Sequence, residues 1–333
     1  MAGTITHYYF AKDVLKKSSK KRKIIFDENY LAIFAQSMDP VNFYSVLFPL
    51  KRGSDFVRKF AGVFHTQKID DFFYNLITEV KNRNLFRNKY VMSFVYGFIC
   101  HYVLDSSIHP YVEFKTGRFN PRDKKTYKYN AKHHEMETYI DAYMLRKHGI
   151  EPRKDKSYKY IFNIKKFDNG LKKLIDDTFL KVYNIQDFSK IYYRSILDMK
   201  YCFRLLRYDV TGIKLRMYKV FDVVSTRRVL NSKFLSYNVK PGDDDYYLNI
   251  NHKNWYYPHN RAFSYNYSVD DIYDNAVKKC VKLVTLVFDY LERNKELDIR
   301  SLFNLSYSTG LYWKKSIWLL YMISWCCALV QAT

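Results

Sequence analysis

Residues 97–141 read GFICHYVLDSSIHPYVEFKTGRFNPRDKKTYKYNAKHHEMETYID and hold four of the nine histidines of the 333-residue chain. His101, Asp105 and His109 are spaced at i, i+4 and i+8, so one face of a helix would carry all three side chains. Imidazole and carboxylate groups gathered in this way are typical ligands of borderline-soft divalent metals, with zinc the first candidate.

A second set of metal-compatible residues follows about two dozen residues later in the same stretch. His133 and Glu137 repeat the four-residue step, and Asp141 lies one turn further on. His134 is an alternative ligand, because a spacing of three residues also places an imidazole near Glu137. One such pair alone is more often a core histidine or a surface ion pair. Two sets on two predicted helical faces favour a metal site.

The hydrophobic pattern predicts an all-α protein. Only 10 Gly and 7 Pro are present, which disfavours both a loop-rich β architecture and disorder. Residues 89–114 form the predicted central helix, whose apolar run at 90–104 should be buried and is short for a membrane span. Further helices are predicted at 4–15, 28–37, 54–64, 69–82, 131–148, 164–184, 187–208, 212–224 and 269–294. Residues 225–268 hold fewer helical signals, and within them 242–260 read as an ordered loop containing His252 and His259, for which a structural role is favoured.

The net charge of +23 would attract anionic partners, either phospholipid surfaces or nucleic acid. The alternative is a solvated surface that is rich in lysine for compositional reasons. Five cysteines without a CxxC pair suggest no disulfide framework and fit a reducing compartment. The N-terminal segment shows no charged region followed by an apolar run, so we expect no signal peptide and a cytoplasmic location.

The C-terminal segment 316–332 contains no charged residue and follows two lysines. A run of this length lies at the lower limit for a transmembrane helix. A tail anchor, an interfacial helix and a buried closing helix all fit, so membrane association through this tail is one expectation. We expect a metal-binding helical core at 1–150, further helices and loops at 151–312 that complete the same or a closely packed domain, and an apolar tail at 313–333.

Three upstream residues complete an ordered series of candidate ligands. His7 lies in the first turn of the predicted N-terminal helix, Asp39 lies at a helix end before Pro40, and His65 follows the next helix. The series H…D…H…HxxxD…H…HxxxE resembles the zinc-dependent phospholipase C family, whose fold is shared with the S1/P1-type nucleases. The resemblance covers about residues 1–145 and is specific as a set, although each piece alone is common.

The resemblance implies a multi-helix bundle that holds two to three zinc ions in a cleft between helices. It assigns one zinc to Asp39, His65, His101 and Asp105. It assigns a second zinc to His109, His133 and Glu137, with His134 as a competitor of His133. Asp105 would also bridge to a third ion, completed by His7 and the N-terminal amine and carbonyl, which would belong to Ala2 after removal of the initiator methionine. The step from Asp105 to His109 is shorter than in the secreted enzymes of the family.

The resemblance also implies an activity and a substrate class. The chain is similar to an intracellular bacterial relative that hydrolyses a phosphodiester, most simply the headgroup linkage of a phospholipid, with Asp39 as both zinc ligand and general base. One alternative is an S1/P1-like nuclease acting on single-stranded nucleic acid, which would use aromatic stacking beside the metals. Another is a non-catalytic family member that keeps zinc for folding.

Overall fold

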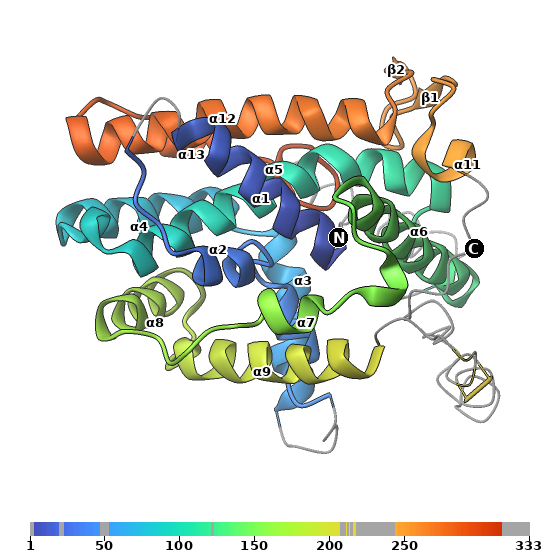
Figure 1. The fold of residues 1–333 in the computed structure, drawn as a ribbon. Coiled ribbons are helices and arrows are strands. Elements are labelled where there is room, and N and C mark those ends of the chain that lie inside the picture. Colours follow the sequence, from blue (N-terminus) through green and yellow to red (C-terminus); the bar gives the residue numbers. More distant parts are fainter. Residues whose placement is uncertain are drawn as a thin grey trace, which may run out of the picture.

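The computed structural model describes residues 3–19, 23–46, 53–120, 123–206, 211, 213, 216–217 and 244–314. In these ranges most residues are helical and the sheet content is very small, which confirms the all-α prediction (Figure 1). The helix predicted at 212–224 falls almost entirely outside the described residues, and the apolar tail at 316–332 lies wholly outside them. The expected division of the chain near residues 150 and 313 stays a prediction.

Helix α5 (Lys89–Thr116) is the central element of the bundle. It begins after Asn88, whose side chain accepts hydrogen bonds from the backbone amides of Tyr90 (2.9 Å) and Val91 (3.3 Å). It ends at Gly117, whose φ of +88° favours glycine. Within the part of the chain that the structure describes, α5 is the one helix long and apolar enough to cross a membrane. Since 94% of its most apolar window is buried inside the protein, α5 is a core helix here.

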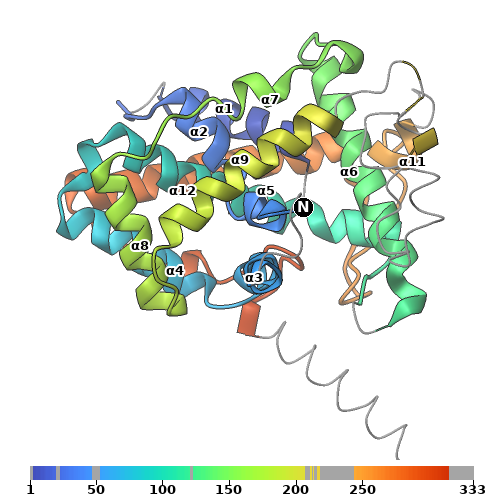
Figure 2. The ribbon, with the colours of Figure 1, turned by 90° about the horizontal axis from the view of Figure 1, so that it is seen from below.

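Several helices pack directly against α5, and the rest of the fold is built on them. α12 (Val269–Arg293) covers one side of α5 and α8 (Asn169–Tyr183) the other, as Figure 1 shows. The others include α1 (Thr4–Ser19), α2 (Glu28–Phe34), α4 (Ile69–Asn82) and α6 (Tyr127–Lys147). The view from below in Figure 2 shows α6 at one end of the bundle and α8 at the other.

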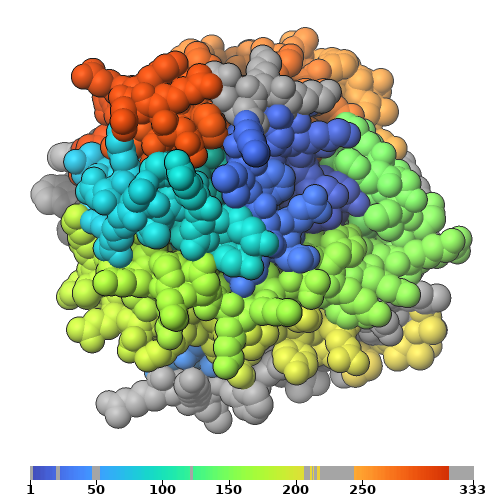
Figure 3. Space-filling view, turned by 60° about the vertical axis from the view of Figure 1, so that its left-hand side comes forward, coloured from blue at the N-terminus to red at the C-terminus, as the bar shows by residue number. Residues whose placement is uncertain are grey.

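The other helical elements complete the fold, and of these η2 also contacts α5. They are η1 (Asp39–Phe43), α3 (Ser54–Thr66), η2 (Leu85–Arg87), η3 (Lys124–Thr126), η4 (Pro152–Lys154), α7 (Ser157–Tyr160), α9 (Phe188–Leu206), α11 (Asp244–Leu248) and α13 (Ile299–Leu302). In the space-filling view of Figure 3, segments from the N-terminal helices, α4, α8 and the α12–α13 region share one face. Segments that are far apart in the sequence therefore meet at the surface as well as in the core.

The region of fewer helical signals at 225–268 contains a small antiparallel hairpin. Its strands are β1 (Trp255–Tyr256) and β2 (Ser264–Tyr265), with Trp255 paired to Tyr265. Helix α6 begins at Tyr127, four residues earlier than predicted. The turn η3 precedes it directly, and Asp123 caps this turn by accepting a hydrogen bond from the amide of Lys125 (2.9 Å).

Candidate metal centre

Helix α5 supplies three side chains to the candidate metal centre. His101, Asp105 and His109 are buried and lie on one face, as their spacing predicts. Oδ2 of Asp105 lies 3.1 Å from Nε2 of His101, and Oδ1 of Asp105 lies 3.9 Å from Nε2 of His109. The carboxylate of Asp105 thus lies between two imidazoles and presents a different oxygen to each.

The helix continues through Pro110, so His109 keeps its place on this face. Proline lacks the N–H that would bind the carbonyl of Ser106 one turn earlier. Gly310 lies against this carbonyl with φ of +64°, and a Cβ at position 310 would lie only 2.5 Å from the Ser106 oxygen. Both the dihedral angle and the close approach therefore require glycine at position 310.

Helix α1 brings His7 to the same carboxylate. Nε2 of His7 lies 3.2 Å from Oδ1 of Asp105, and neither side chain is exposed. The His7 ring stacks on the His101 ring, with centroids 4.0 Å apart and an interplanar angle of 17°. His7, predicted from its place in the chain order, is thus in direct contact with the residues of α5.

The start of α1 is fixed by Asp141 of α6. Its carboxylate accepts hydrogen bonds from the amides of Ile5 (3.0 Å) and Thr6 (2.8 Å) and from the Thr6 hydroxyl (2.6 Å). These amides belong to the first turn of α1, where no intrahelical partner exists. Gly3 permits the approach, since a Cβ there would lie 2.2 Å from Cγ of Asp141. The sequence pattern suggested Asp141 as a metal-compatible residue, but its carboxylate caps α1 instead.

Asp39, His65 and His101 form a second group. Asp39 begins η1, at a helix end as predicted, and its carboxylate is buried. Its Oδ1 lies 3.5 Å from Nε2 of His65 and 3.8 Å from Nε2 of His101. His101 therefore belongs to two groups, one with Asp105 and His7 and one with Asp39 and His65.

Helix α6 completes a third group with His109. Nε2 of His133 lies 2.8 Å from Oε1 of Glu137, and the His133 ring lies 5.5 Å from the His109 ring. His134 also approaches Glu137, with Nδ1 3.3 Å from Oε2. His133 shares the group with His109, whereas His134 belongs to none of the clusters found among the described residues. The geometry favours His133 over His134.

The three groups can each hold a metal ion by their composition. Within each, the ligand atoms all lie within 4.8 Å of one another. The groups are His7, His101 and Asp105; Asp39, His65 and His101; and His109, His133 and Glu137. Together they contain all eight side chains predicted as ligands. Ala2, the predicted source of the N-terminal ligands, lies outside the described residues.

Backbone carbonyls orient three of the imidazoles. Nδ1 of His65 lies 2.6 Å from the carbonyl oxygen of Ala61, and Nδ1 of His101 lies 2.9 Å from that of Ala35. An Nδ1–H that donates to a carbonyl leaves Nε2 as the free lone pair, which is how metal-binding histidines are commonly held. Sequence reasoning missed these contacts, because a backbone acceptor has no signature in residue type.

Tyr307 supplies the third carbonyl and contacts two of the groups. Nδ1 of His109 donates to the carbonyl oxygen of Tyr307 at 2.7 Å, and the amide of Tyr307 donates to the carbonyl of His65 at 3.1 Å. Its fully buried ring lies 5.0 Å from the His65 ring and 5.7 Å from the His101 ring. The segment after α13 therefore positions ligands from two groups.

The protonation states of these residues suit a metal. Burial lowers the pKa of His109 to about 3 and also lowers the pKa of His7. Burial alone would raise the pKa of Asp105, but the imidazoles around it hold that pKa well below its usual value. For His101, the carboxylates of Asp105 and Asp39 outweigh burial and raise its pKa. A neutral His109 and an ionised Asp105 at neutral pH are the forms that bind metal.

Buried atoms without a hydrogen bond also indicate that these residues fit a metal ion. Nε2 of His65 and Nε2 of His109 are buried and form no hydrogen bond to any residue that the structure describes. Buried polar atoms are normally satisfied, and an unsatisfied one calls for an explanation such as an ion. Imidazole nitrogens and carboxylate oxygens are the donor set of zinc in hydrolytic enzymes. The residues present therefore fit zinc.

The other two histidines of interest have structural contacts. Nε2 of His259 lies 2.7 Å from Oε2 of Glu113, with only 3% of the His259 side chain exposed. His252 lies on the surface, with its Nδ1 3.3 Å from Asp271. Both form ion pairs outside the three groups, in keeping with the structural role favoured for them.

Comparison with known proteins identifies a family. A family model described as zinc dependent phospholipase C matches residues 6–185. This range contains all eight candidate ligands and excludes Tyr307. No curated protein and no solved structure matches this chain.

Proposed function

This chain belongs to the zinc-dependent phospholipase C family, and on that premise we propose that it hydrolyses the headgroup phosphodiester of a phospholipid. The products would be a diacylglycerol and a phosphorylated headgroup. The observation that carries the proposal is the convergence of five imidazoles and three carboxylates into three groups of metal-ligand geometry. A zinc site kept only for folding would need one ion with four protein ligands, and not an array of three neighbouring groups.

We propose that each of the three groups contributes the ligands of one zinc ion. Asp39, His65 and His101, with Asp105 beside them, would hold one zinc, and His109, His133 and Glu137 a second. His7 and Asp105 would contribute to a third. Zinc, when bound, supplies positive charge that polarises the phosphoryl oxygen and stabilises the leaving alkoxide.

Asp39 is the residue we assign to proton transfer. Its Oδ1 faces the imidazoles of His65 and His101 at 3.5 and 3.8 Å and is buried without a hydrogen bond to any described residue. The same carboxylate can orient an attacking water and accept its proton at an Oδ atom, which is general-base catalysis. Substitution by asparagine keeps the shape and removes the basic oxygen.

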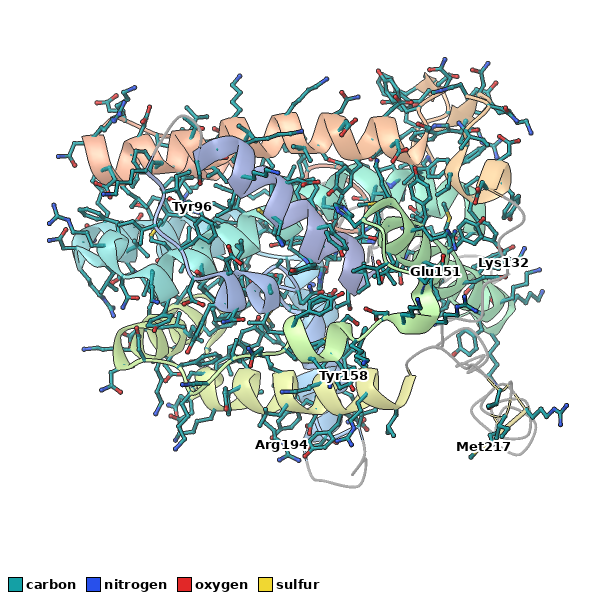
Figure 4. All side chains as sticks on the ribbon, viewed as in Figure 1. Tyr96, Lys132, Glu151, Tyr158, Arg194 and Met217 are labelled. Atoms are coloured by element: carbon teal, nitrogen blue, oxygen red, sulfur yellow. The ribbon has the colours of Figure 1, made fainter. Side chains whose placement is uncertain are left out.

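The open side of the centre faces α6. The side chain of His133 is 25% exposed and that of Glu137 10%, whereas His7 and Asp105 are not exposed at all. A phosphodiester would therefore approach past His133. Lys132, next to it on α6, points away from the bundle in Figure 4, so it covers the outer surface of this helix and not the metal groups.

A paired assay on zinc-loaded protein tests the proposal. We expect release of headgroup from phosphatidylcholine or phosphatidylethanolamine, and loss of this release in Asp39→Asn. Asp177→Asn is the matched control, because Asp177 is a surface residue outside the three groups that pairs with Arg83 (2.8 Å). Less than one zinc per chain would contradict the proposal. Cleavage of single-stranded DNA without any lipid hydrolysis would replace it with the nuclease alternative.

A further inference from the structure

The hairpin β1–β2 exposes aromatic side chains to solvent. Tyr256 is 48% exposed and Phe263 is 54% exposed. Tyr256 pairs with Ser264 in the hairpin register, so its ring points away from the face that carries Trp255. The hairpin thus has one face on the protein body and aromatic groups at its free face and tip.

This exposure is built into a rigid support. Trp255 is buried, its ring lies 5.3 Å from that of Tyr111 in α5, and its Nε1 donates to the carbonyl of Tyr267 at 3.1 Å. The hydroxyl of Tyr257 donates to the carbonyl of Thr309. Large apolar groups held in water by a fixed support indicate contact with another surface.

The hairpin adjoins the open side of the metal centre. His259, near its tip, forms the ion pair with Glu113 at 2.7 Å. Glu113 follows His109 by four residues, which is about 6 Å along a helix. His109 in turn shares a group with His133, the most exposed of the candidate ligands. A surface that binds the hairpin would therefore lie beside the entrance to the centre.

Arg261 and the net charge of the chain favour an anionic surface. Residues 246–267 contain two basic side chains, Lys253 and Arg261, and no acidic one. Lys253 pairs with Asp245, whereas exposed Arg261 forms no salt bridge to a carboxylate of a described residue. Aspartates flank the segment on both sides, at 244–245 and 270–271, so its positive charge is confined to Arg261. An anionic partner complements Arg261 and the net charge of +23 of the whole chain.

We infer that Tyr256, Arg261 and Phe263, here called the hairpin edge, contact an anionic phospholipid bilayer. Aromatic side chains are favoured at the headgroup level of membranes, and an arginine is attracted to anionic lipid. The inference rests on the proposed function, because it concerns how a lipid phosphodiester reaches the same centre. It adds a membrane-contact surface that is independent of the C-terminal tail.

Vesicle binding by the zinc-loaded full-length chain is the first test. We expect co-sedimentation with vesicles of phosphatidylcholine and phosphatidylserine to weaken by about tenfold or more in the double variant Tyr256→Ser/Phe263→Ser. Phe56→Ser is the matched control, because Phe56 is 67% exposed on α3. Arg261→Gln should reduce the preference of the protein for vesicles that contain phosphatidylserine over vesicles of pure phosphatidylcholine. Unchanged binding in the double variant, or an equal loss in Phe56→Ser, would overturn the inference.

Hydrolysis of two substrates is the second test. The double variant should lose activity on vesicles and keep activity on a short-chain phospholipid below its micellar concentration. Equal loss on both substrates would contradict a surface role. If the unaltered protein cleaves neither substrate, the proposed function fails, while vesicle binding still decides the inference. Binding to single-stranded nucleic acid in preference to vesicles would also overturn it.

Discussion

His109 donates a hydrogen bond from Nδ1 to the carbonyl oxygen of Tyr307 at 2.7 Å, across 198 residues of sequence. The bond joins a candidate ligand in the C-terminal part of α5 to a segment outside the region matched by the family model. The orientation of the ligand thus depends on a part of the chain that contributes no ligand itself.

Tyr307→Ala should therefore weaken both stability and zinc binding. Loss of a fully buried aromatic ring costs roughly 3–5 kcal/mol. The variant keeps the carbonyl and amide of residue 307, but without the buried ring this backbone should shift relative to His109 and His65 and lower zinc affinity by about 10- to 100-fold. Urea unfolding and zinc titration measure the two effects. Tyr307→Phe keeps the ring and should bind zinc almost as the unaltered protein does. Unchanged zinc affinity in Tyr307→Ala would contradict a positioning role.

The sharing of His101 between two groups predicts unequal zinc losses. His101→Ala should remove more zinc per chain than His109→Ala, because His109 belongs to one group only. Metal analysis of the purified proteins measures the difference. His252→Ala, at the surface, should keep the full zinc content. Equal zinc contents in the first two variants would rule out the shared role of His101.

Asp141→Ala should destabilise the protein by roughly 2–4 kcal/mol, since a helix cap is lost and buried amides lose their acceptor. The affected helix is α1, which carries His7, so zinc content should also fall. Asp177→Ala removes only a surface ion pair and should cost no more than about 1 kcal/mol. Denaturant unfolding compares the two variants. A similar loss in both would show that the cap contributes little.

Metal-free protein should lose stability as the pH falls. The pKa of His109 is about 3 in the folded chain, below the ordinary value of 6.5, so the unfolded chain binds more protons between these values. Stability from this group is thus present above pH 6.5 and is lost as the pH falls towards 3. Between pH 7.5 and 5.5, the contribution of His109 to the free energy of unfolding falls by roughly 1.4 kcal/mol. Urea unfolding at both pH values should show a smaller loss in His109→Asn. Identical losses would contradict the neutral, buried state of His109.

Local spacing predicted part of this centre from the sequence. The i, i+4, i+8 series of His101, Asp105 and His109 depends only on helix geometry, and α5 places these side chains as expected. His7 and Asp39 were found through the resemblance to a family, because no local pattern relates residues so far apart.

Other features of the structure have no recognisable pattern in the sequence. Asp141 has the spacing of a metal ligand, and only the tertiary contact with α1, across 135 residues, gives it a capping role. The carbonyl of Tyr307 could not be found, because every residue carries a carbonyl. The hairpin at 255–265 was expected only as part of a region with fewer helical signals, since two-residue strands are too short to show a period.

The 198-residue separation of His109 and Tyr307 also determines when the metal centre can form during synthesis of the chain. At 5–20 residues per second, the ribosome adds Tyr307 about 10 to 40 seconds after His109. During that time α5 could fold against α1 and α6, but His109 would lack the acceptor that sets its orientation. A fully oriented centre therefore forms only when almost the whole described chain has been made, so a nascent chain would acquire its final metal geometry late.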